Sequence, residues 1–104
     1  MNVQYLFNSL GAWVAFRMGQ YVFSPEGNWI GWLPWNDGDV VDISGSYLGT
    51  IFAGGRFYRR FHPTYHGYPG YPNYPGYPGY PGYPGFAGYS PLPPGTEDVD
   101  LEAA

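Results

Sequence analysis

The chain of 104 residues contains no cysteine and no lysine. The absence of cysteine excludes disulfides, zinc sites built on thiolates, and thiol catalysis. No apolar run approaches the roughly 20 residues that a membrane-spanning helix needs. Residues 1–5 lack the basic region before an apolar run that is typical of a signal peptide. The default expectation from these absences is a soluble cytoplasmic protein with no membrane span.

Positive charge is also scarce, since four arginines stand against eight acidic residues and the net charge is −4. The arginines and acids of residues 1–61 balance, and the whole negative excess lies in residues 96–104. Binding to nucleic acid depends on a basic surface that neutralises phosphates. The sequence therefore argues against a nucleic-acid partner.

Three segments of the first sixty residues match one another, namely residues 5–16, 21–32 and 39–50. Each has an apolar run, a small polar residue, a glycine three residues later, then an aromatic and an aliphatic residue. Asparagine, serine and aspartate suit the first position of a turn, and glycine suits a later position with positive φ. Each segment is therefore predicted to be a β-hairpin, and regular repeats of this kind indicate stacked or rotationally arranged units.

A truncated fourth segment begins at Arg56, so the predicted fold class is all-β, a small pseudo-four-fold repeat of short hairpins. Strand alternation assigns one face of each hairpin to the core. The predicted core residues are Leu6, Val14, Val22, Ile30, Val40, Leu48 and Phe57. On the other face a large ring is followed two residues later by a small residue, in the pairs Trp13 with Ala15, Trp29 with Gly31, and Tyr47 with Gly49. The small residue either leaves room for a ring of the neighbouring unit or marks a bulge.

The segments Gly27-Asn28-Trp29-Ile30-Gly31 and Gly45-Ser46-Tyr47-Leu48-Gly49 carry a Gly-x-aromatic-aliphatic-Gly motif. Over residues 4–60 the chain resembles the bacterial four-fold β-flower domain. The resemblance implies hairpins arranged as petals around a pseudo-four-fold axis, and it implies no activity. Ala15 replaces a motif glycine in the first unit, and the fourth unit lacks its turn glycine. The N-terminal segment is one candidate for completing the fourth petal.

From residue 65 to residue 89 an aromatic residue occupies every third position, and most are followed by proline and preceded by glycine. Proline and glycine disfavour both helix and sheet, and polyproline II has the matching period of three. We therefore divide the chain into a hairpin-repeat domain (1–61), a disordered tail rich in Tyr, Pro and Gly (62–95), and a solubilising acidic end (96–104). The tail is expected either to make weak multivalent contacts through its tyrosines or to act as a flexible spacer.

Nothing in the sequence predicts an enzyme, a cofactor or a metal site. His62 and His66 have the spacing of metal ligands on a helix, but Pro63 and the following glycines argue against a helix. Residues 36–39, Asn-Asp-Gly-Asp, contain a fragment of a calcium loop without its other ligands, and Asp-Gly is more typical of a turn.

Trp32 and Trp35 lie on the longest connection between the repeats and are candidates for stacking on a sugar or docking a peptide; alternatively Trp32 closes the end of the core. The leading hypothesis is a non-enzymatic interaction protein that associates with itself or with another protein through its tail. The alternative is a ligand-binding module for carbohydrate or peptide. The candidate binding residues are Trp32, Trp35, Tyr68, Tyr71, Tyr74, Tyr77, Tyr80 and Tyr83.

Overall fold

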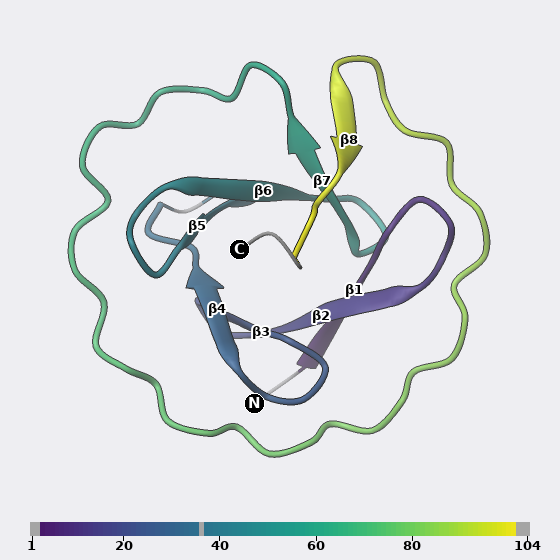
Figure 1. Ribbon diagram of the computed structural model, residues 1–104, viewed down its shortest axis with the longest axis horizontal. Coiled ribbons are helices and arrows are strands. Elements are labelled where there is room, and N and C mark those ends of the chain that lie inside the picture. Colours follow the sequence, from purple (N-terminus) through teal and green to yellow (C-terminus); the bar gives the residue numbers. More distant parts are fainter. Residues whose placement is uncertain (1–2, 36, 102–104) are drawn as a thin grey trace.

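The computed structural model describes residues 3–35 and 37–101, and these residues form eight β-strands and no helix (Figure 1). The predicted all-β class is confirmed. The strands are β1 (Val3–Phe7), β2 (Trp13–Met18), β3 (Tyr21–Phe23), β4 (Trp29–Trp32), β5 (Asp39–Asp42), β6 (Tyr47–Phe52), β7 (Arg56–Arg60) and β8 (Thr96–Asp98). Accordingly, no segment of the described chain is a helix capable of crossing a membrane.

Each strand pairs with the next one along the chain, in the order β1 to β8. The sheet closes because β1 also pairs with β7 in parallel, where Phe7 lies opposite Arg56. The backbone N–H of Phe7 donates to the carbonyl of Gly55 at 2.8 Å beside this junction. Seven strands therefore form a closed barrel, and β8 is added outside the closure, on β7.

The first three hairpins, β1–β2, β3–β4 and β5–β6, repeat one another in structure as they do in sequence. The register shifts at the same point in each, at Leu6/Phe7, Val22/Phe23 and Val40/Val41. The three turn glycines have φ values of +89°, +89° and +94°. The side chain that opens each turn accepts a hydrogen bond from the backbone N–H four residues later, over 2.9 to 3.1 Å. Both predicted turn positions are confirmed.

Replacing Gly45 with valine is expected to destabilise the protein by about 1–3 kcal/mol, because a β-branched residue is strongly disfavoured at positive φ. An added Cβ would meet only Cγ of Pro69, at 3.3 Å, so the cost comes mainly from backbone strain. Chemical denaturation of the variant checks this value. Unchanged stability would mean that the turn adopts another conformation, and Gly45→Ala should lie between the variant and the parent.

A fourth hairpin is formed by β7 and β8, whose residues are separated by the long segment 61–95. The N–H of Phe61 donates to the carbonyl of Gly95 at 2.9 Å and closes this hairpin. The equivalent hydrogen bond in the first hairpin runs from the N–H of Asn8 to the carbonyl of Ala12. The partner of β7 in the hairpin is thus the C-terminal strand, while the N-terminal strand β1 meets β7 at the barrel closure.

The acidic segment 96–104 was expected only to solubilise the chain, and in the structure its first residues are part of the sheet. Both carboxylate oxygens of Asp98 are bonded to Ser9, at 2.8 Å from its backbone N–H and 2.6 Å from its hydroxyl. Glu97 lies 3.6 Å from the guanidinium of Arg59. These partners explain why acidic residues are tolerated in β8.

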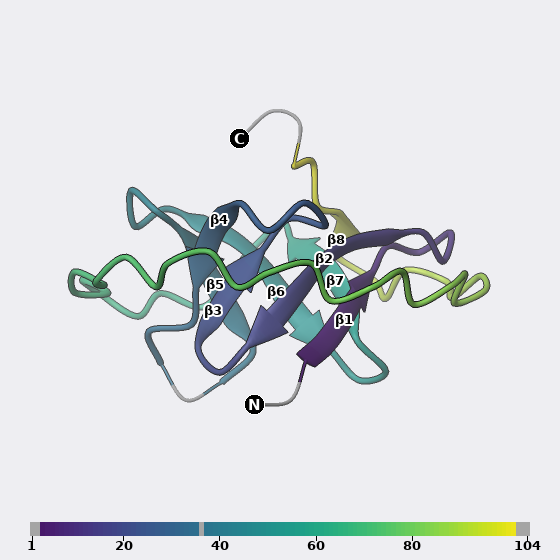
Figure 2. The same ribbon diagram turned by 90° about the horizontal axis from the view of Figure 1, so that it is seen from below.

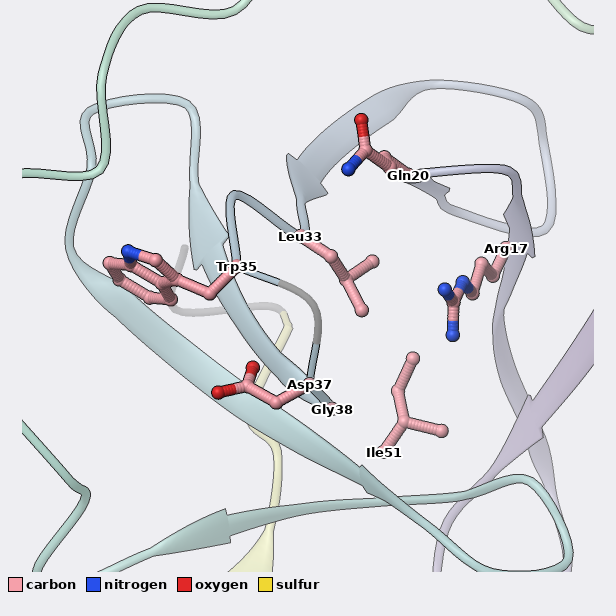
Figure 3. Close-up of a pocket in the computed structure, with 7 residues that line it drawn as sticks. All are labelled: Arg17, Gln20, Leu33, Trp35, Asp37, Gly38 and Ile51. Carbon is pink, nitrogen blue, oxygen red and sulfur yellow. The ribbon is translucent and has the colours of Figure 1, made fainter. Parts of the chain in front are cut away.

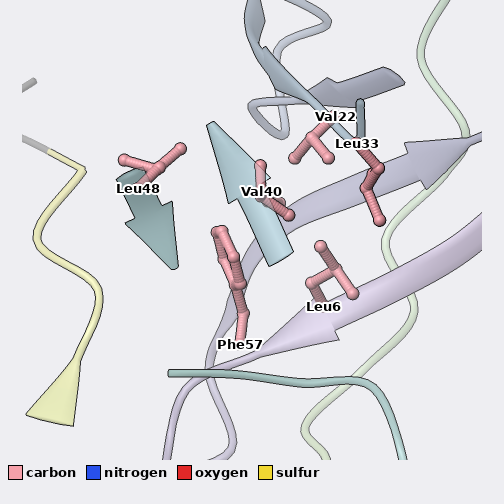
Figure 4. Close-up of a cluster of buried hydrophobic side chains, with 7 residues drawn as sticks. Leu6, Val22, Leu33, Val40, Leu48 and Phe57 are labelled. Atoms are coloured by element: carbon pink, nitrogen blue, oxygen red, sulfur yellow. The ribbon is translucent and has the colours of Figure 1, made fainter. Parts of the chain in front are cut away.

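The core fills the centre of the barrel (Figure 4). Five predicted core residues are buried there, namely Leu6, Val22, Val40, Leu48 and Phe57. Val14 and Ile30 pack against this cluster but are only partly buried. Ala15 and Leu33 complete the cluster. Ala15 had been assigned to the opposite face, but the register shift in the first hairpin pairs it with Leu6 and it is fully buried. Leu33 was missed because it lies in the connection after β4 rather than in a strand.

Residues 62–95, which we call the belt, were expected to be disordered, whereas the structure gives them a defined path around the barrel. Figure 1 shows this segment encircling the sheet, and Figure 2 shows it at the level of the barrel's waist. The belt is not a continuous polyproline II helix, because seven of its glycines have φ between +83° and +93°, namely Gly67, Gly70, Gly76, Gly79, Gly82, Gly85 and Gly88. A residue of positive φ in successive triplets turns the chain repeatedly, so that it can follow a curved surface.

Candidate interaction surface

The belt crosses the tips of the first three hairpins in reverse order. Pro69 contacts the turn of the third hairpin at Gly45, Tyr77 contacts the second at Gly27, and Gly88 contacts the first at Gly11. An added Cβ on Gly11 would lie 2.5 Å from backbone atoms of Gly88. Because both ends of the belt belong to the fourth hairpin, the segment runs from one hairpin tip past the other three and returns. The turn glycines therefore allow the positive φ of the turns and also leave room for the belt to pass close to them.

Arg56 fastens the last part of the belt to the barrel. Its guanidinium donates to the carbonyls of Asn8, Gly88 and Ala87 at 2.9, 3.0 and 3.2 Å. The N–H of Ala87 donates in turn to the carbonyl of Gly11 at 2.9 Å. One charged side chain thus satisfies carbonyls on both sides of the junction, and hydrogen bonds to charged donors are stronger than neutral ones.

The orientation of the belt residues follows the period of three. Proline and glycine are mostly half-buried against the barrel, and the aromatic residues are exposed. Their exposed fractions lie between 61% and 91%, for Tyr65, Tyr68, Tyr71, Tyr74, Tyr77, Tyr80, Tyr83, Phe86 and Tyr89. The apolar rings of this segment therefore face outward, and together they form a ring-shaped aromatic surface around the protein.

Several belt tyrosines also touch tryptophans of the barrel. The centroids of Tyr80 and Tyr83 each lie 5.9 Å from that of Trp13, and the centroid of Tyr74 lies 5.6 Å from that of Trp29. These distances lie in the range of favourable ring pairs. The tryptophans are positioned by their own hydrogen bonds, from each indole N–H to the carbonyl two residues ahead, at 2.7 and 2.8 Å.

Trp32 and Trp35, which were predicted as a pair, lie in different surroundings. Trp32 borders a pocket of about 390 Å³ formed with the belt near Tyr68 and Tyr71. A Cβ added to Gly70 would lie 3.9 Å from the ring of Trp32, and the indole nitrogen of Trp32 is buried without a hydrogen-bond partner. Trp35 borders another pocket, which Leu33 and Asp37 also line. The two indoles are therefore separate features rather than two walls of one site.

Trp35 stacks on His66 with the ring centroids 3.9 Å apart and the planes inclined by 17°. The Nε2 atom of His66 lies 2.7 Å from Oδ2 of Asp39 and 3.3 Å from Oδ2 of Asp37. Trp35 and Asp37 also line a pocket of about 330 Å³ whose opposite wall includes Arg17 (Figure 3). This cluster holds the first residues of the belt against the connection between β4 and β5.

The sequence suggested other groupings for the residues of this cluster. His66 was paired with His62, which is exposed and is not among the grouped ligand atoms of the described residues. Asp37 and Asp39 were grouped with Asn36, which lies outside the described residues. No sequence signal joins His66 to the aspartates, because their contact depends on where the belt leaves β7. Comparison with protein-family models, with curated proteins and with solved structures finds no match to this chain.

Proposed function

We propose that this protein is a non-enzymatic interaction protein that associates with further copies of itself through the aromatic surface of the belt. The observation that carries the proposal is the outward orientation of nine aromatic side chains, each at least 61% exposed. Large exposed apolar surfaces on soluble proteins mark sites of association. We further propose that the barrel has the four-fold β-flower arrangement, a proposal that its four hairpins support.

Self-association is favoured over binding to a charged partner because the belt contains no acidic or basic residue other than two histidines. Ring contacts are therefore the main attraction that the belt offers. Each pair of rings contributes only about 0.5–1.5 kcal/mol. Since the rings point outward all around the barrel, one molecule can contact several neighbours, and linked weak contacts give a much higher combined affinity.

Replacing Tyr65, Tyr68 and Tyr71 with serine is expected to weaken self-association strongly while leaving the melting temperature unchanged within about 3 °C. These three side chains are 81% to 91% exposed, so their loss removes little contact inside the molecule. Light scattering across a series of protein and salt concentrations measures the effect. The parent protein should associate more as salt rises, because its charge of −4 opposes association and salt screens charges beyond about 10 Å.

The matched control replaces the same three tyrosines with phenylalanine, which keeps the rings and removes the hydroxyls. It should associate as strongly as the parent protein. A parent protein that stays monomeric up to millimolar concentration at high salt would exclude self-association. If the serine and phenylalanine variants lose self-association equally, the contacts between molecules depend on the tyrosine hydroxyls rather than on the rings.

A further inference from the structure

The Asp37, Asp39 and His66 side chains bring three metal-ligating groups together from two distant parts of the chain. One ligand atom from each residue lies within 4.8 Å of the other two. The aspartates belong to the start of β5 and the connection before it, and His66 belongs to the belt. The cluster is mostly shielded, since the side chains of His66 and Asp39 are only 19% and 11% exposed.

Each carboxylate directs one oxygen toward His66 and uses the other to bond the protein. Oδ1 of Asp39 accepts the hydroxyl of Thr50 at 2.7 Å, which leaves Oδ2 facing the imidazole. Oδ1 of Asp37 accepts the backbone N–H of Asp39 at 2.9 Å, which again leaves Oδ2 facing the imidazole. Partners that fix the outer oxygen of a ligand in this way are typical of metal sites.

The ligand orientation is supported by further contacts outside the cluster. The hydroxyl of Thr50 is also within 2.7 Å of the hydroxyl of Tyr47, which accepts the backbone N–H of Arg60 at 2.9 Å. On the other side, the indole of Trp35 lies flat against the imidazole of His66. The carboxylate of Asp39 and the imidazole are therefore held in place by a chain of hydrogen bonds and by stacking.

The imidazole of His66 cannot satisfy both carboxylates with one N–H. Two Oδ2 atoms converge on one Nε2 atom, and a single N–H can donate fully to only one of them. A divalent cation would bind all three atoms, and its charge would balance the two carboxylates beside a neutral imidazole. Around a tetrahedral zinc ion with bonds of about 2.0–2.1 Å, neighbouring ligand atoms lie about 3.3 Å apart. The distance from Nε2 to Asp37 is already 3.3 Å, and that to Asp39 would need to widen from 2.7 Å.

We propose that Asp37, Asp39 and His66 bind a divalent first-row transition-metal ion. The single imidazole favours zinc, nickel or copper over magnesium and calcium, which prefer sites made only of oxygen ligands. Asp37 is 41% exposed, so water completes the coordination on that side. A bound ion joins the first part of the belt to the barrel through His66.

Isothermal titration of the whole protein with zinc tests the proposal. One ion per chain is expected to bind, and both His66→Gln and Asp39→Asn should weaken the affinity by at least tenfold. Thr50→Val keeps the shape of the side chain but removes the hydroxyl that orients Asp39. Because Thr50 only positions Asp39, this substitution should lower the zinc affinity by about tenfold. The matched control is His62→Gln, which removes the other histidine and should leave the affinity within twofold of the parent.

Nickel offers a second readout, because a paramagnetic ion beside an indole quenches its fluorescence. Saturating nickel should quench the parent protein, and the quenching should largely disappear in Trp35→Phe while zinc affinity remains within a few-fold. Melting curves without metal show whether each variant is folded. The proposal is overturned by absence of saturable zinc binding up to millimolar concentration, or by equal zinc affinity in His66→Gln and the parent.

Discussion

A chain that ends at Thr64 is expected to melt about 15–30 °C below the whole protein. It lacks β8, the side chains of Val99 and Leu101 that pack against the core, and the bond of Asp98 with Ser9. Partial burial of two aliphatic side chains and a charged hydrogen bond together contribute about 3–5 kcal/mol. For a domain of this size each kcal/mol corresponds to roughly 4–8 °C. Thermal unfolding followed by circular dichroism measures the loss.

The control for this truncation keeps β8 and removes only the belt. Residues 62–94 are replaced by Asn-Gly, so that Phe61 and Gly95, which already share a hydrogen bond, flank a two-residue turn of the type preferred in hairpins. This variant should melt within about 10 °C of the parent and should no longer self-associate. If the chain ending at Thr64 melts within about 5 °C of the parent, β8 is not part of the cooperative unit.

Gly31→Ala is expected to destabilise the protein by about 3 kcal/mol, although alanine is normally a mild replacement. Gly31 has no positive φ, so the backbone itself accepts alanine. An added Cβ would, however, overlap the carbonyl oxygen of Val41 on β5 and crowd Val40 at 3.2 Å. Because the obstacle is backbone in a paired strand, the sheet must move, and such overpacking typically costs 1–3 kcal/mol or more. Denaturant unfolding gives the value.

Gly54→Ala separates packing from backbone strain in this experiment. Gly54 has a φ of +79° and no atom within 4 Å of an added Cβ. Its replacement should cost only the strain of the left-handed region, about 1–2 kcal/mol. If Gly31→Ala lowers the free energy of unfolding less than Gly54→Ala does, β4 and β5 adjust easily. Close packing would then not be the reason that residue 31 is glycine.

The hairpins were predictable because the signals that specify them are local. The polar residue that opens each turn and the glycine that follows act within five residues, as the bond from the N–H of Ala12 to Asn8 illustrates. The requirement for a small residue at 31 was also visible in the sequence. Its cause differs from the expected neighbouring ring, since the backbone of Val41 occupies the space there. At Gly49 a ring does approach, because Cε1 of Phe57 would lie 2.9 Å from an added Cβ.

The belt and the cluster at His66 were not predictable from the same reasoning. A repeat of Tyr, Pro and Gly offers no hydrogen-bond pattern of its own, so composition alone indicates disorder. The order comes from partners elsewhere in the chain, such as Arg56 bonding the carbonyl of Gly88 and Tyr5 donating to the carbonyl of Pro81. Contacts between such distant residues depend on the completed barrel, so the spacing of residues in the sequence does not predict them.

The separation of β7 from β8 along the chain has a consequence for the folding pathway. Leu6 and Ala15 pair across a short turn, whereas Arg59 pairs with Glu97 only after a long loop has closed. Contacts between residues far apart in sequence carry a greater entropic cost and slow the search for the native state. The first three hairpins are thus expected to form early, with the pairing of β8 as a late event. Until then β7 presents an unpaired edge, the part of a nascent sheet most exposed to misassembly.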